Sequence, residues 1–502
     1  MAGLPETDWK RAGANLYRVL ESAVAQAPTR KYVISGETSI SYATFMAVVE
    51  CLAADLEAQA RGKSVAIFLP NSLAFLAAYF AVLRVGGKPA LVNINTPPAA
   101  FDKLVFDFAP DLVIASAPIA GFTTRVVTDE DVIALSQNPT ADRAAPYDIE
   151  PDDICATLFT GGTTGLPKRI NHSHQMVVDA VDRMEWGWPT VEGEVWLPVA
   201  PFTHIYGYLM GVTNPMLKAG TIVLPPRFQP DLVVDLLAQH SVTVFGGGPP
   251  AIYQAMMAAK NFGEADLSAL KVCPGGGAPF PVALHENWQK ATGRTIMEGY
   301  GMTEMAPISV NSTHSGFQFG SAGQPVPDVD IQIADLETGV PLTAAGQKGE
   351  VRIRGPHMMK GYEGQAEETA GTLRDGFVYT GDIGMLDEDG FLLITDRKKD
   401  VIFHKGFNVF PREVEEVLLQ ISGTQQACVV GLEDERSGEA VVAFVMSEGG
   451  LAEEAVRAHC AEHLSDYKVP AHICIEPSLP LTPNGKLDRV ALRETAKTNF
   501  GA

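Results

Sequence analysis

Short apolar runs alternate with longer helical patterns through most of the chain. The runs are rich in Val, Ile and Leu, and several end in Gly or Pro, which is typical of buried strands. Their alternation with helices predicts an α/β fold of layered, mostly parallel sheets. Ligands in such folds bind at loops beyond the carboxyl ends of the strands. The predicted strands are "KSVAIFLP" (63–70), "PALVNIN" (89–95), "DLVIAS" (111–116), "ICATLFT" (154–160), "TIVLPP" (221–226), "VTVFGGGPP" (242–250) and "LKVCPGGG" (270–277).

The pattern changes near residue 320. Shorter alternating runs with turn residues, such as "GEVRIRGPHMM", predict a small antiparallel β section. After the charged segment "DRKKD" (396–400), strands and helices follow one another in a compact α+β order. We therefore expect a large N-terminal domain at residues 1–396 and a small α+β domain at residues 397–502.

The composition is that of a globular protein with more than one core. The chain has 502 residues, of which 46% are hydrophobic and 20% are charged. The formal net charge of -22 argues against nucleic acid and anionic membrane as the main partner, because both are bound through clustered Lys and Arg. The most apolar early stretch, residues 73–83, is too short to span a bilayer and predicts a buried helix.

The first residues and the cysteines point to the cytoplasm. The start, "MAGLPETDWK", lacks a signal-peptide pattern. The six cysteines show no CxxC or Cys/His ligand spacing. Reduced, mostly buried thiols are therefore expected.

A stretch rich in glycine and threonine, "FTGGTTGLPKR" (159–169), overlaps the end of a predicted buried strand. Its glycines let backbone N–H groups approach an anion, its threonines add hydroxyl donors, and its lysine adds a positive charge. The GxxxxGK[ST] pattern of a Walker A loop is absent, and a surface turn is the alternative. The candidate phosphate-binding residues are Thr160, Gly161, Gly162, Thr163, Thr164, Gly165 and Lys168.

Three further segments carry candidate site residues. In "EGYGMTEMAP", Glu304 could bind Mg²⁺ and Tyr300 could lie against a base. Asp382 and Arg397 suit a ribose diol, because a carboxylate can accept two hydrogen bonds. Lys486 lies in the Pro/Gly-rich segment "PLTPNGKLDR". Taken singly, each of these segments could be a plain turn, and a lone lysine in a loop such as Lys486 is normally just solvated.

Taken together, in this order and with these spacings, the segments resemble those of the adenylate-forming superfamily of acyl-CoA synthetases, nonribosomal adenylation domains and firefly luciferase. The resemblance covers nearly the whole chain. Family members join a carboxylate to AMP with release of pyrophosphate, and a thiol then attacks the acyl-adenylate and releases AMP. The resemblance is carried by "TGGTTGLPK", "PFTHIYG", "YGMTE", "GEVRIRGPHMMKGY", "YTGD", "DRKKDVIFHKGFNVFPREVE" and "PNGKLDR".

The resemblance implies a role for each segment in the first step. The Gly/Thr-rich stretch would hold the triphosphate of ATP, and Asp382 with Arg397 would hold its ribose. Thr303 would contact the α-phosphate, and Glu304 would hold Mg²⁺. Lys486 would bridge the carboxylate and the α-phosphate and offset the negative charge there. The adenine would lie between two segments, Gly276, Gly277, Ala278 and Pro279 on one side and Glu298, Gly299, Tyr300, Gly301 and Met302 on the other.

The resemblance also implies that the C-terminal domain rotates between the two steps. Lys399 stands at the hinge position of "DRKKD". Rotation would bring "HKGFNVF" to the site, where Gly406 would let a pantetheine arm pass and Lys405 could meet CoA phosphates. The chain departs from the common family pattern at Gly161, often a serine, and at Arg169, often a glycine. The role of Arg169 is not assigned by the sequence.

The acyl pocket implied by the family is glycine-rich and apolar, with no obvious cation. Gly299 stands where malonate-type ligases carry an arginine, and no aspartate is placed to bind an amino-acid ammonium group. An uncharged monocarboxylic acid is therefore expected, with a fatty acid favoured and aryl or cinnamate-type acids open. For His204, a place near the acyl carboxylate competes with a plain core histidine. The candidate substrate-binding residues are His204, Tyr208, Gly247, Gly248, Gly275, Gly299, Met305 and Ala306.

The simplest interpretation is a free-standing cytoplasmic enzyme that uses ATP, Mg²⁺ and CoA on a small-molecule carboxylic acid. One alternative is a stand-alone adenylating enzyme that loads a carrier protein. Another is a non-catalytic nucleotide or acyl-adenylate sensor, against which the intact Lys486, Thr303 and Glu304 argue. No nucleic acid or integral membrane segment is expected, and a homodimer is left open.

Overall fold

The computed structural model describes residues 15–96, 101, 104–105, 107–140, 142–160, 167–434, 436–447, 449–481 and 487–501. The chain forms two compact units. The large unit runs to Ile331 and includes Ile353–Val378 and Gly390–Leu392, and the small unit comprises Gln332–Arg352, Tyr379–Asp389 and the residues from Leu393 onward. The predicted α/β class, with a large N-terminal part and a small C-terminal part, is confirmed. The domain boundary near residue 397 stays a prediction.

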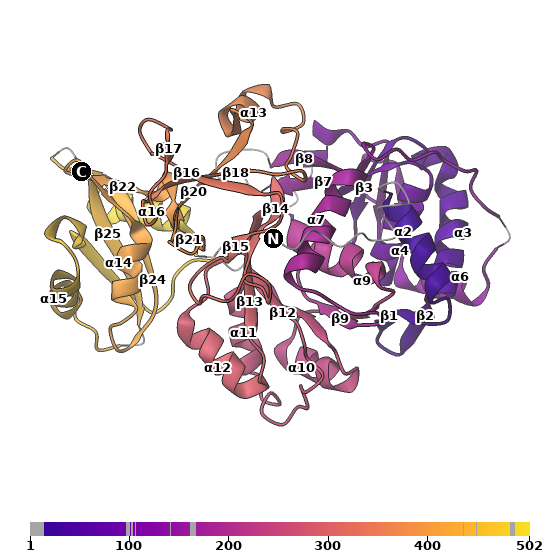
Figure 1. Cartoon of the computed structure of the whole chain (residues 1–502), viewed down its shortest axis with the longest axis horizontal. Helices are drawn as coiled ribbons and strands as arrows, with labels where there is room; N and C mark the ends of the chain where they lie inside the picture. The colour runs from indigo at the N-terminus through magenta and orange to yellow at the C-terminus, as the bar shows by residue number, and fades with distance from the viewer. Residues whose placement is uncertain are drawn as a thin grey trace. The chain divides into compact units, whose positions relative to one another are not determined.

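One sheet of the large unit is mostly parallel, as the alternating pattern predicts. In spatial order its strands are β6 (Thr124–Val126), β5 (Leu112–Ala115), β3 (Ser64–Phe68), β4 (Lys88–Leu91), β7 (Ile154–Thr160) and β8 (Lys168–Ser173). Every neighbouring pair is parallel except β7–β8. The helices beside it are α3 (Tyr42–Ala60), α4 (Leu73–Arg84) and α6 (Asp129–Gln137), which pack against one another (Figure 1).

A second sheet of the large unit has the order β11 (Val244–Gly246), β9 (Val195–Pro198), β10 (Thr221–Leu224), β1 (Lys31–Ser35) and β2 (Thr38–Ser41). Its strands are parallel from β11 to β1, and β2 is antiparallel. Buried side chains of both sheets and their helices form one large hydrophobic core. The helices of this region are α2 (Leu16–Gln26), α7 (His174–Gly187), α8 (Ile205–Tyr208) and α9 (Asn214–Leu217), with a π-helical turn at Leu209–Thr213.

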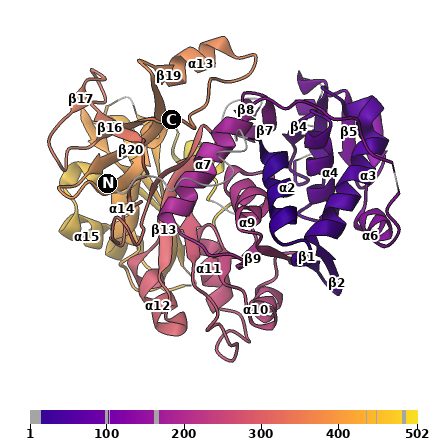
Figure 2. The ribbon, with the colours of Figure 1, turned by 45° about the vertical axis from the view of Figure 1, so that its right-hand side comes forward.

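A third sheet carries several of the predicted site segments. Its order is β12 (Cys273–Gly276), β13 (Ile296–Met302), β14 (Met305–Val310) and β15 (Gln324–Pro325), with β12 and β13 parallel and the other pairs antiparallel. Trp288 is fully buried in the core beside it. The neighbouring helices are α10 (Pro230–Gln239), α11 (Pro250–Met257) and α12 (Val282–Thr292), which lie in a row (Figure 2).

The predicted small antiparallel section is present. Its strand order is β17 (Pro341–Leu342), β16 (Asp330–Ala334), β18 (Gly349–Arg354), β20 (Phe377–Leu386) and β19 (Leu373–Arg374), and β21 (Leu392–Arg397) pairs with β20. The pairs β16–β17 and β19–β20 are antiparallel. The short helix α13 (Ala366–Thr372) leads directly into β19.

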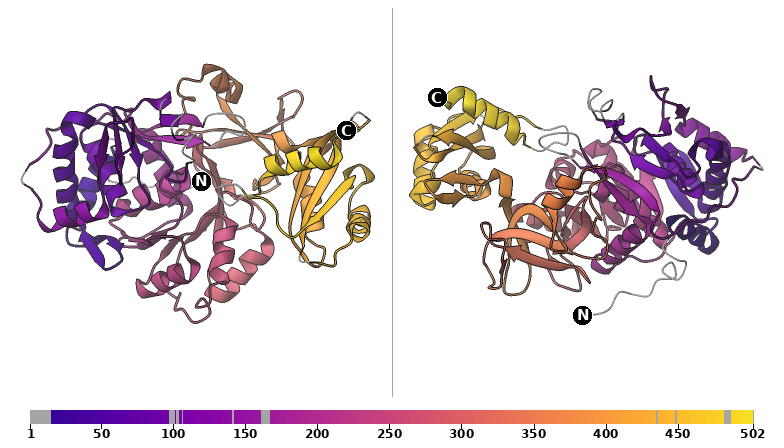
Figure 3. Two further views of the ribbon diagram at one scale, coloured as in Figure 1. Left: turned by 180° about the vertical axis from the view of Figure 1, so that it is seen from behind. Right: turned by 90° about the horizontal axis from the view of Figure 1, so that it is seen from above.

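The C-terminal part of the small unit is a sheet covered on two faces. Its order is β23 (Phe407–Val409), β22 (Ile402–His404), β25 (Gly438–Ser447) and β24 (Thr424–Asp434), and β26 (His472–Glu476) pairs with β25. Alternate residues of β24 and β25 point into two separate hydrophobic clusters, as the two-residue period of a strand requires. Helices α14 (Pro411–Leu418) and α15 (Glu453–His463) cover one face, and α16 (Arg489–Phe500) covers the other (Figure 3).

The predicted buried helix and the predicted free, mostly buried cysteines are both confirmed. Residues 73–83 lie in α4, whose residues are all buried except Arg84. The part of the chain that the structure describes holds no helix with the length and apolarity to cross a membrane. The six cysteines are free, five of them buried and Cys474 partly exposed.

Candidate functional site

The described part of the predicted phosphate-binding stretch is a strand hairpin. Thr160 at the end of β7 pairs with Lys168 at the start of β8. The register therefore places these two predicted residues opposite each other. The remaining predicted residues of the stretch, Gly161, Gly162, Thr163, Thr164 and Gly165, lie outside the described residues.

Lys168 contacts the segment that leads into α13. Its ammonium group lies 2.5 Å from Glu368 Oε2 and 4.6 Å from the centroid of the Tyr362 ring. The next residue, Arg169, has its Nε 3.3 Å from Glu363 Oε2. These contacts tie β8 to residues 362–368, and they give Arg169 a structural partner that the sequence did not reveal.

Thr303 and Glu304 form the tight turn between β13 and β14, where Met302 pairs with Met305. Glu304 is 7% exposed, and its Oε1 accepts a hydrogen bond of 2.6 Å from the Tyr362 hydroxyl. Burial, and then the charge of Glu304, raises the pKa of Tyr362 well above its usual value. The tyrosine therefore stays protonated and remains the donor.

The segment from His357 to Tyr362 holds this turn at further points. Nε2 of His357 donates to the Pro307 carbonyl at 2.7 Å, and the Met359 amide donates to the Glu304 carbonyl at 2.8 Å. Burial lowers the pKa of His357 to about 3, so its imidazole is neutral at physiological pH. Together with the tyrosine hydroxyl, these bonds fix both the backbone and the carboxylate of Glu304.

His172 of β8 is a second buried histidine in this region. Burial lowers its pKa to about 4, against a smaller opposing effect of the Thr303 backbone. The side chain is 4% exposed. The region thus holds two neutral, buried imidazoles, those of His172 and His357, and the second is hydrogen-bonded to the Pro307 carbonyl.

Glu304 fits the role of a magnesium ligand. Its Oε1 is taken by the tyrosine hydroxyl, and its Oε2 receives no hydrogen bond from the rest of the described chain. Mg²⁺ is usually held by one or two carboxylates, with phosphate oxygens and waters as the other ligands. Within the described ranges no cluster of three or more His, Cys, Asp or Glu side chains could bind a metal alone. A cation here would thus depend on oxygens of a bound phosphate.

The predicted adenine and acyl segments are neighbours at the ends of β12 and β13. Gly275 pairs with Glu298 and Gly276 pairs with Gly299 across the two strands. Gly248 bridges to Gly275, and the Gly276 amide donates to the Gly248 carbonyl at 3.1 Å. A Cβ added at Gly276 would lie 2.7 Å from the Gly299 carbonyl oxygen, so this approach requires glycine. Segments distant in sequence thus meet at one sheet edge.

The remaining predicted residues of these segments lie close by. Gly277, Ala278 and Pro279 directly follow β12. On the β13–β14 hairpin, Tyr300 pairs with Ser309, and a Cβ on Gly301 would lie 2.8 Å from that of Ala306. Gly247 packs against the Tyr253 ring.

The Glu298 side chain is directed into the protein. It is 6% exposed, and its Oε2 lies 3.4 Å from His285 Nε2. Its carbonyl oxygen accepts a bond of 2.8 Å from the Asn311 amide. The carboxylate thus faces His285 in the interior and is largely shielded from solvent.

His204 and Tyr208 lie at the two ends of α8 in different environments. His204 is exposed and caps the helix, its Nδ1 accepting from the Tyr206 amide at 3.3 Å. Tyr208 is fully buried, and its hydroxyl shares a hydrogen bond of 2.6 Å with Tyr79 and lies 3.7 Å from Cys155 Sγ. A substrate contact by Tyr208 would require opening of this core network, whereas His204 is accessible.

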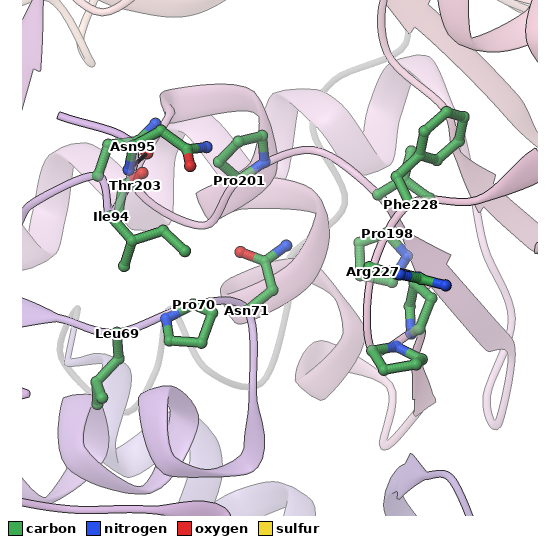
Figure 4. A pocket seen from close by; sticks show the side chains of 14 residues that line it. Leu69, Pro70, Asn71, Ile94, Asn95, Pro198, Pro201, Thr203, Arg227 and Phe228 are labelled. Atoms are coloured by element: carbon green, nitrogen blue, oxygen red, sulfur yellow. Dashed lines mark hydrogen bonds between the residues drawn. The ribbon is translucent and has the colours of Figure 1, made fainter. Parts of the chain in front are cut away.

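A pocket of about 290 Å³ opens at the carboxyl ends of strands from two sheets (Figure 4). The loops after β3, β4, β9 and β10 line it. Asn71 joins two of these loops, since its side chain donates to the Ala200 carbonyl and accepts from the Phe202 amide, both at 2.8 Å. Of the described residues that line the pocket, Arg227 alone carries a charge. No motif in the sequence predicted this pocket, although Pro and Asn residues follow the four strands and were a signal.

Asp382 and Arg397, the predicted ribose-binding pair, lie together in the small unit. Arg397 Nε is 2.7 Å from Asp382 Oδ1. The aspartate is on β20 and is buried, whereas the arginine ends the neighbouring strand β21 and is exposed. The pair thus presents the arginine to solvent.

The predicted hinge and acceptor residues also belong to the small unit. Lys399 lies in the 3₁₀ turn Lys398–Asp400, where partial burial lowers its pKa against the opposing effect of a neighbouring aspartate. Lys405 and Gly406 form the tip of the β22–β23 hairpin with φ of 52° and 79°, the signature of a type I′ turn. Lys486 lies outside the described residues.

Tyr362 is the site candidate that the sequence analysis left without a role. It is the last residue of the quoted segment "GEVRIRGPHMMKGY". Its position in that segment was a signal, but its two partners, Lys168 and Glu304, are far away in the chain. Only folding brings the three side chains together.

Two family models match the chain. The model described as "AMP-binding enzyme" matches residues 20–363, and the model described as "AMP-binding enzyme C-terminal domain" matches residues 413–486.

Several curated proteins are similar in sequence. A long-chain-fatty-acid–CoA ligase of Bacillus subtilis (strain 168) is 39% identical over 362 residues, which cover 70% of this chain and 63% of that protein. A protein of the same name from Salmonella typhimurium is 31% identical over 487 residues, covering 87% of this chain and 86% of that protein. A feruloyl-CoA synthase of Amycolatopsis sp is 32% identical over 489 residues, covering 95% of this chain and 97% of that protein.

Solved structures agree with this relationship. The ATP-bound form of MatB from Rhodopseudomonas palustris superimposes with a TM-score of 0.90 at 28% identity, covering 97% of this chain and 100% of that chain. The o-succinylbenzoate CoA synthetase MenE from Bacillus subtilis, in complex with the acyl-adenylate OSB-AMP, gives a TM-score of 0.84 at 25% identity, with coverage of 95% and 97%. The chain therefore belongs to the AMP-binding enzyme family, among the acyl-CoA synthetases of the adenylate-forming superfamily.

Proposed function

We propose that this enzyme is an AMP-forming carboxylic acid–CoA ligase that acts on an uncharged monocarboxylic acid, with a fatty acid favoured. One observation carries the proposal. In the large unit, the cation Lys168 and the carboxylate Glu304 contact one and the same side chain, Tyr362. A cation and a carboxylate with an unengaged oxygen, both in contact with one tyrosine, suit a site for a nucleoside triphosphate and Mg²⁺.

In the first step the substrate carboxylate attacks the α-phosphorus of ATP, and pyrophosphate leaves. Such an in-line displacement depends mainly on positioning and on neutralisation of charge. Lys168 would hold the departing phosphates, and Thr303 would contact the α-phosphate from the turn. Lys486 would offset the negative charge where carboxylate and α-phosphate meet. Mg²⁺, when held by Glu304, would supply further neutralisation of the phosphate oxygens.

The nucleoside would be held by the other predicted residues. Asp382 would accept hydrogen bonds from the ribose hydroxyls, with Arg397 beside it. The adenine would lie between the segment after β12, residues 276–279, and residues 298–302 of β13. The pairing of Gly276 with Gly299 supports this role, because it brings the two segments together with little side-chain bulk.

In the second step the thiol of CoA attacks the acyl-adenylate, the acyl group moves to sulfur, and AMP leaves. Lys399 would serve as the hinge for the change between steps. Lys405 and Gly406 form an open hairpin tip, where a Cβ on Gly406 would meet no atom within 4 Å. This accessibility supports a role for the tip in passing a pantetheine arm. Arg227, which lines the pocket of about 290 Å³, would supply a cation for a phosphate of CoA.

The preference for an uncharged acid is supported by the packing around Gly299. A Cβ at this position would lie 2.9 Å from Trp188 Cζ2, so the backbone here leaves no room for an arginine. Without a cation, a second carboxylate on the substrate would be buried unpaired, which is costly. The similarity to the long-chain-fatty-acid–CoA ligases named above also supports a fatty acid as the substrate.

An aryl or cinnamate-type CoA ligase is the second candidate. The specific observation in its favour is the relative named feruloyl-CoA synthase, which aligns over 95% of this chain. A stand-alone enzyme that loads a carrier protein is the third candidate. For all three candidates we expect a cytoplasmic location.

A pyrophosphate-release assay tests the proposal. The enzyme is given ATP, Mg²⁺ and a panel of short, medium and long fatty acids, a dicarboxylic acid, and ferulic and benzoic acids. We expect the highest kcat/KM for a fatty acid and little turnover of the dicarboxylic acid. AMP release is then compared with CoA and with a pantetheinylated carrier protein as acceptor. No pyrophosphate release with any acid would reject an adenylating function, and faster release with the carrier would reject CoA as the acceptor.

A further inference from the structure

Tyr362 makes one contact with each of two oppositely charged groups. Its hydroxyl donates to Glu304 Oε1 at 2.6 Å, and its ring lies 4.6 Å from the ammonium nitrogen of Lys168. The side chain is 7% exposed, so both contacts are largely shielded from water. A buried bond to a carboxylate is about twice as strong as one between neutral groups.

The hydroxyl bond selects one of the two oxygens of Glu304. Because Oε1 accepts from the tyrosine, the plane of the carboxylate is fixed, and Oε2 is the oxygen left for a cation. The Met359 amide meanwhile holds the Glu304 carbonyl at 2.8 Å. Side chain and backbone of the glutamate are thus both held by the segment that ends at Tyr362.

The ring of Tyr362 acts on Lys168. An ammonium group over the face of an aromatic ring is attracted by the negative charge of that face. Tyr362 therefore favours a Lys168 side chain that stays over its ring. Without the ring, the flexible lysine would be held here by Glu368, which is more than half exposed.

Tyr362 is itself well anchored. Its amide donates to Thr369 Oγ1 at 2.9 Å, and its backbone bridges to Ile170 of β8. The following amide, of Glu363, donates to the Arg169 carbonyl at 2.9 Å. The tyrosine is therefore fixed to the strand that begins with Lys168.

We propose that Tyr362 is a positioning residue for the metal and phosphate site: its hydroxyl orients Glu304 so that Oε2 receives Mg²⁺, and its ring holds the Lys168 ammonium group in place for phosphate. The proposal rests on the proposed function. The role of Tyr362 is nevertheless distinct from the proposed function, because Tyr362 would touch neither nucleotide nor metal and would act through two other side chains. Loss of a residue that orients a metal ligand typically lowers the affinity for the metal about 10–100-fold.

The test uses Tyr362→Phe, which removes the hydroxyl and keeps the ring. Binding of α,β-methylene-ATP, an analogue that cannot release pyrophosphate, is measured by calorimetry over a series of Mg²⁺ concentrations. We expect the Mg²⁺ concentration for half-maximal binding to rise about tenfold, with little change in binding of the analogue in the absence of Mg²⁺. Tyr362→Leu, which also removes the ring, should weaken the metal-free binding as well, by about threefold.

Two controls separate positioning from packing. Tyr42→Phe removes another buried tyrosine hydroxyl, one that donates to the Gly220 carbonyl at 2.7 Å, and should leave the Mg²⁺ midpoint unchanged. Replacement of Tyr362 by 4-aminophenylalanine keeps the ring and supplies an N–H donor, and it should restore the midpoint to within about threefold of the parent. This second variant also keeps the test usable if the phenylalanine variant folds poorly.

The outcomes distinguish the two proposals. If Glu304→Gln raises the Mg²⁺ midpoint while Tyr362→Phe does not, the positioning role is rejected and the proposed site stands. The positioning role is also rejected if 4-aminophenylalanine fails to restore the midpoint in a folded protein. If the parent enzyme does not bind the analogue, or if Glu304→Gln leaves the midpoint unchanged, the proposed metal and nucleotide site itself is wrong.

Discussion

The hydroxyl of Tyr362 donates a hydrogen bond of 2.6 Å to Oε1 of Glu304, across 58 positions of the sequence. This bond joins the end of one quoted segment, "GEVRIRGPHMMKGY", to the turn of another, "YGMTE". The same tyrosine ring faces Lys168, which belongs to a third segment. Three segments of the resemblance thus meet through one side chain to which the sequence analysis assigned no role.

Lys486→Ala should slow the first step and spare the second. The lysine is proposed to neutralise charge that develops where the carboxylate meets the α-phosphate, so its loss should lower the rate of acyl-adenylate formation about 10²–10³-fold. Thioester formation from a supplied acyl-adenylate and CoA should stay within about threefold of the parent. Single-turnover rates of both half-reactions check this. Lys497→Ala, at an exposed lysine paired with Glu494, is the matched control. Equal losses in the two half-reactions would contradict the assignment.

Glu368→Gln should tighten binding of Mg·ATP. Glu368 pairs with Lys168 at 2.5 Å and so competes with phosphate for the lysine. Because the carboxylate is 57% exposed, the pair is weak, and its loss should lower the KM for ATP only about two- to fivefold. Steady-state kinetics with ATP varied measures the effect.

The neighbouring Glu367 provides the control for this prediction. It lies in the same first turn of α13 and carries the same charge. Glu367→Gln changes the net charge equally and should leave the KM for ATP as it is. If the KM for ATP fell equally in both variants, the change in net charge would explain the effect, and the pair of Glu368 with Lys168 would not.

Gly299→Ala should destabilise the large unit. The added Cβ would lie 2.9 Å from Trp188 Cζ2 and 3.1 Å from Val310 Cγ1. Trp188 cannot easily move away, because its Nε1 donates to the Asn311 carbonyl at 3.1 Å. Overpacking of this kind costs about 1–3 kcal/mol, which should appear as a lower Tm in calorimetry. Gly263→Ala, where a Cβ meets nothing within 4 Å, should leave the Tm unchanged. A Tm equal to that of the parent for Gly299→Ala would remove the steric argument against an arginine there.

Stability of the small unit should fall as the pH rises. Burial raises the pKa of Asp396 from 3.8 to about 7. The folded state therefore binds this proton more tightly than the unfolded chain does. The resulting stability is fully present below about pH 4 and is lost as the pH passes through about 7. We expect the free energy of unfolding to decrease by on the order of 2–4 kcal/mol from this group over that range.

Hydrogen exchange of β24 and β25 amides at several pH values measures this effect in the small unit. Asp396→Asn, which cannot ionise, should remove most of the decrease. Asp466→Asn, at an exposed aspartate of the same unit, should retain it. A pH dependence that is the same in the parent and in Asp396→Asn would show that another group is responsible.

Much of the fold and the family could be predicted from the sequence because local patterns encode them. The alternation of apolar runs and helices predicted the layered sheets, and the turn residues after residue 320 predicted the antiparallel section. The apolar stretch at 73–83 was correctly interpreted as a buried helix, since its length excluded a membrane span. Side-chain periodicity and turn chemistry are properties of neighbouring residues, and they need no knowledge of distant contacts.

The tertiary structure alone decided which groups face one another. The sequence proposed Lys168 and Glu304 in separate segments, and folding showed that Tyr362 joins them. It proposed Asp382 and Arg397 together for the ribose, and folding showed that they form an ion pair. Folding also placed the Tyr208 hydroxyl in the core. The sequence determines the order of the segments and the chemistry that each can offer. Hydrogen bonds and burial between distant segments depend on the sheet that assembles them, and no local pattern records such contacts.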